Sequence, residues 1–231
     1  MKSETLSSAL NVVAALLLGL ALAAPRAASA QAVVGATNVT TNMGNFSSST
    51  PIGNVIDQSG LSTGYTSGVT DFATYIAGNP THFSASSGLD WISSTGVTTG
   101  NVDFDLGAAF TIDRFALWNI GDNDSRNLTG FTLLASPDNT FATTTNLGSF
   151  TASTTDPAAA APAQVFSFTA TSTQFVRMQI TSNNGSVRTG FGEAAFGQAA
   201  AVPEPSTLAL GSMLAAAGLG CAAVRRRRRA A

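Results

Sequence analysis

The stretch VDFDLGAAFTIDRFALWN, residues 102–119, decides the fold prediction, because its first part alternates strictly between apolar and polar residues. Val102, Phe104 and Leu106 are separated by Asp103 and Asp105. A period of two places successive side chains on opposite faces of an extended chain. The stretch therefore predicts a half-buried β-strand whose two aspartates face solvent.

Similar runs follow at FTLLAS (131–136), VFSFTA (165–170) and FVRMQITS (175–182). In the last run we expect Val176, Met178 and Ile180 to face the core, and Arg177 and Gln179 to face solvent. Gly, Ser, Thr, Asn and Ala dominate the rest of the central region, and no long amphipathic helix is indicated. This pattern favours an all-β sandwich or barrel.

The first 30 residues are typical of a secretory signal peptide. Lys2 precedes the apolar run LNVVAALLLGLALAA (10–24), and the small residues that end at Ala30 fit a cleavage site before Gln31. A retained membrane anchor is the alternative, although the run of 15 apolar residues is shorter than the roughly 20 that span a bilayer. We therefore expect the chain to be exported.

The chain ends with an uncharged segment that is followed by consecutive arginines. Thr207 to Val224 comprises 18 residues without a charge, and Arg225 to Arg229 follow directly. As a helix this segment would be about 27 Å long, just short of the thickness of a hydrocarbon core. Arginines favour the cytoplasmic side of a membrane. The sequence predicts a transmembrane helix at 207–224 and a basic cytoplasmic tail at 225–231.

Pro203, Glu204 and Pro205 stand just before this helix, in a linker that covers 198–206. The prolines lack N–H groups and keep the junction extended. Motif, span and arginines in this order resemble the PEP-CTERM sorting signal of Gram-negative bacteria. The resemblance implies that an exosortase in the inner membrane cleaves the transiently anchored chain near the motif. The body then reaches the cell surface or extracellular matrix, commonly in species that make exopolysaccharide. An ordinary C-terminal anchor is the alternative.

Residues 31–197 are long enough for one domain with its own core. Between Gln31 and Ala201, four arginines stand against ten aspartates and one glutamate, which leaves a net charge of −7, and lysine is absent. This balance argues against a nucleic-acid partner, because phosphate contacts need clustered Lys and Arg. The only cysteine, Cys221, lies in the C-terminal apolar run, so the body has no intramolecular disulfide and no thiolate site.

The strands expected at 102–119, 131–138 and 174–183, with the closing GFGEAAFG (190–197), resemble in order those of the discoidin-like, coagulation-factor type C family. The resemblance implies a single jelly-roll β-sandwich, here flanked by the signal peptide and the sorting helix. It also implies a structural calcium ion held between an early aspartate loop and the glutamate of the last strand, at Asp57 and Glu193. Glu193 stands in an apolar stretch, where an unpaired carboxylate is costly to bury, and Arg177 or Arg188 are alternative partners for it.

The loop NIGDNDSRNLTG (119–130) lies between two predicted strands and offers polar side chains for a ligand. Sugar recognition needs hydrogen-bonding groups that reach neighbouring hydroxyls, and an aromatic face on which the sugar stacks. The candidate ligand-binding residues are Asp122, Asn123, Arg126 and Asn127, with His82, Trp91 and Arg188 as neighbours. Two alternatives stay open: a solvated hairpin in which Arg126 pairs with Asp122 or Asp124, and core positions for Trp91 and Trp118.

Catalysis is not indicated by the residues of the body. His82 is its only histidine, and the aspartate pairs at 103/105 and 122/124 are explained by a solvent-facing strand and by a turn. We therefore expect a non-catalytic, exported surface or matrix protein that binds carbohydrate, such as the exopolysaccharide of its own cell. A structural or adhesion protein that binds protein partners is the first alternative, and a polysaccharide-acting enzyme is the second.

Overall fold

Two long antiparallel strands, β5 (Gly100–Trp118) and β9 (Gln164–Asn183), form the centre of a computed structural model that describes residues 31–83, 88–154 and 160–200. The strand order is β1-β11-β5-β9-β6-β7, and β2 also pairs with β5. These further strands are β1 (Val33–Val34), β2 (Asn38–Thr41), β6 (Leu128–Ser136), β7 (Thr145–Thr151) and β11 (Glu193–Gln198). The all-β prediction is confirmed, because every predicted run lies in β5, β6 or β9.

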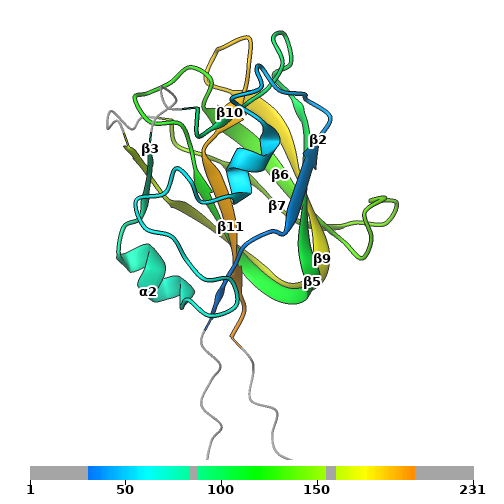
Figure 1. The fold of residues 1–231 in the computed structure, drawn as a ribbon. Helices are drawn as coiled ribbons and strands as arrows, with labels where there is room; N and C mark the ends of the chain where they lie inside the picture. The colour runs from blue at the N-terminus through cyan, green and yellow to red at the C-terminus, as the bar shows by residue number, and fades with distance from the viewer. Residues whose placement is uncertain (1–30, 84–87, 155–159, 201–231) are drawn as a thin grey trace, which may run out of the picture. The chain divides into compact units, whose positions relative to one another are not determined.

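The sandwich arises because β5 and β9 bend together, as Figure 1 shows. The register between them breaks between Asp105 and Phe110, where Gly107 has a φ of +82° and its N–H donates to the Asp105 carboxylate at 2.8 Å. Before the break β5 pairs with β2, and after it β5 pairs with β11. Each long strand therefore contributes to both layers of the sandwich.

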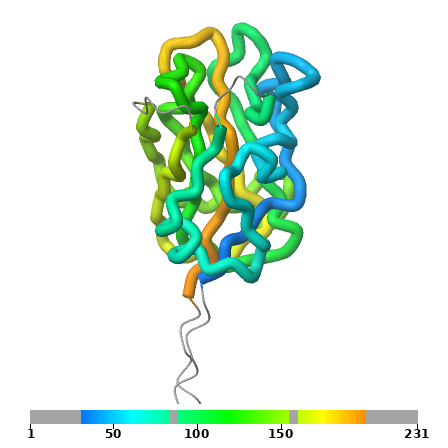
Figure 2. The backbone as a smooth tube through the Cα atoms, turned by 60° about the vertical axis from the view of Figure 1, so that its left-hand side comes forward, coloured from blue at the N-terminus to red at the C-terminus, as the bar shows by residue number. Residues whose placement is uncertain are grey.

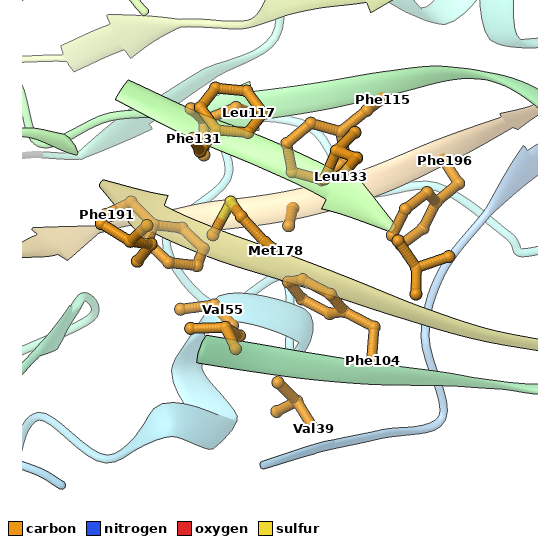
Figure 3. Close-up of a cluster of buried hydrophobic side chains, with 14 of the residues drawn as sticks. Val39, Val55, Phe104, Phe115, Leu117, Phe131, Leu133, Met178, Phe191 and Phe196 are labelled. Carbon is orange, nitrogen blue, oxygen red and sulfur yellow. The ribbon is translucent and has the colours of Figure 1, made fainter. Parts of the chain in front are cut away.

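The main core lies between these layers and is rich in phenylalanine (Figure 3). Phe104 from the first part of β5 meets Phe196 of β11 edge to face, with ring centroids 5.6 Å apart. Val176, Met178 and Ile180 of β9 are buried, whereas Gln179 is exposed and Arg177 half-buried. The predicted orientation of β9 is confirmed. Burial of such side chains contributes about 1.5–3 kcal/mol each.

A second, smaller cluster covers the outer face of the β11 layer. It contains Trp118, whose indole N–H donates to the carbonyl of Pro80 at 2.9 Å, and Phe72 from the short helix α2 (Phe72–Ala77). Asp71 caps this helix by accepting a hydrogen bond from the N–H of Thr74. The segment between β2 and β5 is thus a cover over the sheet. It also holds the 3₁₀ helix η1 (Ile52–Ile56), β3 (Thr81–Phe83) and β4 (Trp91–Ile92).

Four connections gather at one end of the sandwich, which we call the loop end: 42–50, 93–99, 119–127 and 183–189 (Figures 1 and 2). The last of them leads into β10 (Gly190–Phe191), which pairs with β4, while β8 (Ala160–Pro162) pairs with β3. The first and last described residues lie together at the opposite end, where the N–H of Gln198 donates to the carbonyl of Ala32.

The predicted signal peptide (1–30), sorting motif (203–205), transmembrane helix (207–224) and basic tail (225–231) lie outside the described residues. Within the described residues, no helix has the length and apolar character needed to cross a membrane.

Candidate functional site

The loop end is tied into one surface by backbone hydrogen bonds between its connections. The N–H of Gly96 donates to the carbonyl of Val187 at 2.9 Å, and the N–H of Ser94 donates to the carbonyl of Met43 at 3.0 Å. On the other side, the N–H of Asn184 donates to the carbonyl of Asn127 at 2.9 Å. Side chains on all four connections are therefore held in fixed relative positions.

Arg126, a predicted ligand residue, is paired with Asp124. Its Nε donates to Oδ1 of Asp124 at 2.8 Å, its backbone N–H donates to the same atom at 2.7 Å, and Nη2 contacts Oδ2. Burial acts to raise the pKa of Asp124, but the hydrogen bonds from Arg126 outweigh it and lower that pKa. The structure thus matches the braced-hairpin alternative. Asp122 and Asn123 are exposed beside this pair, with φ of 63° and 50°.

Three other predicted ligand residues are buried and do not reach a surface: His82, Trp91 and Asn127. Trp91 packs edge-on against Phe191 in the core, and its indole N–H donates to the carbonyl of Gly44 at 2.9 Å. The core alternative is therefore correct for Trp91, whose ring is not available for stacking on a sugar. The imidazole of His82 is clamped between two backbone segments, because a Cβ on Gly60 or Gly192 would lie 2.0 or 2.4 Å from it.

Arg188, the remaining predicted neighbour, does lie at the loop end. Its guanidinium carbon stands 3.8 Å from the ring centroid of Phe46, and its Nε donates to Oγ1 of Thr95 at 2.9 Å. Phe46 is 47% exposed and the adjacent Val187 is 61% exposed. We call Phe46, Thr95, Val187 and Arg188 the stacked-arginine surface. It offers an aromatic ring, apolar area and hydrogen-bond donors together.

Phe46 is not among the residues predicted from the sequence. The signal that could have identified it is its isolation: a single aromatic residue in the polar run TNMGNFSSST (41–50). Its neighbours in space come from connections that lie far away along the chain, so no local pattern joins them. Binding residues lie disproportionately on loops that a rigid scaffold holds in place.

Glu193 and Asp57, the predicted calcium ligands, lie near each other, because the residue after Asp57 donates a hydrogen bond to Glu193. Glu193 is fully buried, and its Oε2 accepts a hydrogen bond from the N–H of Gln58 at 2.9 Å, whereas Oε1 has no hydrogen-bond partner. Burial raises the pKa of Glu193 to about 9, and the negative charge of Asp57 acts in the same direction. Asp57 is itself exposed and accepts a hydrogen bond from the N–H of Ser59.

Neither of the alternative partners pairs with Glu193. Arg177 forms a bidentate pair with Asp103, with distances of 2.7 and 2.8 Å, and Arg188 stacks on Phe46. Within the described ranges, no group of three or more His, Cys, Asp or Glu side chains is placed to hold a metal ion. Any ion at Glu193 and Asp57 would therefore need backbone carbonyls or water as further ligands, which calcium accepts.

Asp90 is a buried acid that the sequence analysis does not single out. It is fully buried, and neither carboxylate oxygen has a hydrogen-bond partner. Its Oδ1 lies 3.4 Å from Nδ1 of His82, but that N–H donates to the carbonyl of Phe83 at 2.7 Å. Burial raises the pKa of Asp90 to about 7, with Arg126 opposing the shift and Asp124 adding to it. Burial lowers the pKa of His82.

The chain is similar to known proteins in two of three comparisons. The family model described as "F5/8 type C domain" matches residues 44–192. A search of curated proteins found no match.

Solved structures share the fold at low identity. A truncated AlyQ with CBM32 and alginate lyase domains is 21% identical with a TM-score of 0.50, and the match covers 74% of this chain and 34% of that one. The CBM32-1 and CBM32-2 domains of Clostridium perfringens ZmpB, in complex with GalNAc, are 11% identical with a TM-score of 0.51, covering 71% and 33%. The chain thus spans about a third of these two solved chains, and the likeness establishes the fold.

Proposed function

The chain belongs to the F5/8 type C domain family, and on this premise we propose that it is a non-catalytic protein that binds carbohydrate at the stacked-arginine surface. The observation that carries the proposal is the stack of Arg188 on the half-exposed ring of Phe46. Carbohydrate is the ligand class because a sugar presents both C–H faces and hydroxyls. The GalNAc complex of a structural neighbour supports the same class.

The fixed geometry of this surface favours binding over catalysis. The guanidinium donates a hydrogen bond to Thr95 and lies over the ring of Phe46, so little side-chain entropy is lost when a ligand binds. One acid of each aspartate pair is engaged in an ion pair: Asp103 pairs with Arg177, and Asp124 pairs with Arg126. A glycosidase would instead need two acids placed across a cleft.

Glycan binding by a Phe46→Ala variant tests the proposal. Loss of the stacking ring should weaken binding about 10-fold or more, as loss of one aromatic contact typically does. Phe83→Ala is the matched control, because Phe83 is a similarly exposed phenylalanine (55%) on β3, outside the four loop-end connections. Wild-type protein that binds protein extracts of the matrix but no glycan on an array would favour the adhesion alternative.

We also propose that Glu193 and Asp57 hold a structural calcium ion. The unpartnered, fully buried Oε1 of Glu193 supports this, because a buried oxygen without a partner is costly and a cation would satisfy it. The negative charge of Asp57 nearby suits the same ion. When bound, the ion would join the loop that follows η1 to the start of β11. Its role would then be to stiffen the cover over the sheet rather than to contact the sugar.

The proposed route to the surface is the exosortase pathway, and its support is the order of motif, apolar segment and arginines in residues 203–229. Export by the signal peptide and cleavage near Pro203 would place the sandwich at the cell surface or in the extracellular matrix of a Gram-negative bacterium. The exopolysaccharide of the same cell is then the nearest carbohydrate.

A further inference from the structure

The described residues contain four arginines, and three of them form ion pairs: Arg114 with Asp113, Arg126 with Asp124, and Arg177 with Asp103. Arg188 is the exception among the described residues, since none of their carboxylates pairs with it. The body is acidic overall and lacks lysine, so carboxylates are plentiful for pairing. A cation left without one at the loop end is a feature to be explained.

Arg188 is nevertheless held in a fixed position. Its backbone N–H donates to Oγ of Ser186, its carbonyl accepts from Nδ2 of Asn183, and its Nε donates to Thr95. The guanidinium carbon lies over the ring of Phe46, 3.8 Å from its centroid. No hydrogen bond joins either Nη group to a residue that the structure describes. Two donors of a pre-oriented fork thus remain available to a ligand.

A guanidinium that is fixed in position and not paired with a carboxylate of the protein binds a carboxylate of a ligand more strongly than it binds a hydroxyl. Its planar edge can donate two parallel hydrogen bonds to the two oxygens of a carboxylate, and such charge-assisted pairs are about twice as strong as neutral ones. Stacking on an aromatic ring leaves this edge free. The loop 119–127 carries no competing free cation, because Arg126 is already neutralised by Asp124. Selectivity for an acid would therefore depend on Arg188 alone.

We propose that the stacked-arginine surface binds an acidic sugar, with the carboxylate of a uronic-acid residue against the two Nη groups of Arg188 and the sugar ring against Phe46 and Val187. The inference rests on the proposed carbohydrate-binding function and narrows it to carboxylate-bearing polysaccharides. Because the body is negatively charged, an acidic polysaccharide is not attracted to the protein by long-range electrostatics. Recognition would be local and sensitive to salt.

The test compares polyuronates with their carboxyl-reduced forms, which keep the linkage and lose only the charge. Purified full-length protein is titrated with polygalacturonate, polymannuronate and hyaluronate, each in both forms. We expect at least one acidic form to bind about 10- to 100-fold more tightly than its reduced form, the range expected for a charge-assisted fork. Arg188→Gln should remove this preference, and Arg188→Lys should keep only part of it.

Arg114→Gln is the control for a change in net charge, because Arg114 lies in the second half of β5 and pairs with Asp113. It should leave the preference intact, and matched melting curves should show that each variant is folded. Equal binding of acidic and reduced forms, or equal effects of the two glutamine variants, would overturn the acidic-sugar inference but leave carbohydrate binding standing. Equally tight binding of polyaspartate would also overturn it. Binding to no glycan in either form would remove the proposed function itself.

Discussion

Replacing Asp90 by asparagine should change how the stability of the protein depends on pH. The carboxyl group is fully buried without a hydrogen-bond partner, and burial raises its pKa from 3.8 to about 7. Between these two values the folded chain keeps a proton that the unfolded chain releases. The stabilising contribution of this group is therefore complete below about pH 4 and is lost as the pH rises towards 7.

The size of the effect follows from the pKa shift. Each pH unit between the two pKa values costs about 1.4 kcal/mol, so wild type should lose about 2 kcal/mol relative to Asp90→Asn between pH 5 and 6.5. Asparagine has nearly the same shape and does not titrate. Urea unfolding of both proteins at several pH values measures the difference between their free energies of unfolding. The contributions of other titrating groups, such as Glu193, are the same in both proteins and cancel in this difference. Parallel stability curves across this range would show that Asp90 is ionised in the folded state and that the argument from burial fails.

Three further predictions concern the metal, the buried histidine and the tail. Chelator should lower the melting temperature of calcium-loaded wild type but not of Glu193→Gln; equal melting with and without chelator would exclude the ion. Gly60→Ala should cost about 1–3 kcal/mol in urea unfolding, because its Cβ would overlap His82, whereas Gly53→Ala should cost little, because its Cβ would meet no atom within 4 Å. Replacing Arg225 to Arg229 by serine should abolish retention and processing of the precursor, and normal maturation on an immunoblot would contradict the sorting prediction.

The strands of the core could be predicted from sequence because their burial is periodic. The alternation in 102–106 and in 175–180 assigns each side chain to a face without reference to any other segment, and the structure confirms both assignments. The division of β9 into two runs was less accurate, since 164–183 is one continuous strand. Its middle part lies where β5 and β9 bend, and there the alternation fades because neither face is consistently buried.

The candidate site was harder to predict because burial of a loop residue depends on distant segments. His82 lies two residues after a proline in a polar stretch, yet Gly60 and Gly192 enclose its ring. Arg126 could have faced a ligand, but Asp124 lies two residues away and pairs with the Nε and Nη2 groups of its guanidinium. Phe46 contacts Arg188, although the two residues are 142 positions apart in the sequence. Only Arg188 among the predicted ligand residues lies on the stacked-arginine surface.

The position of the chain ends connects the proposed ligand surface with the proposed route to the cell surface. The last described residues lie beside the first ones, since Gln198 donates to the carbonyl of Ala32 while β1 pairs with β11. The stacked-arginine surface lies at the opposite end of the sandwich (Figure 1). A body attached through its C-terminal end would therefore keep Phe46 and Arg188 away from the point of attachment. Such an arrangement suits a protein whose ligand is a polymer outside the cell, because the polymer can approach without displacing the anchor.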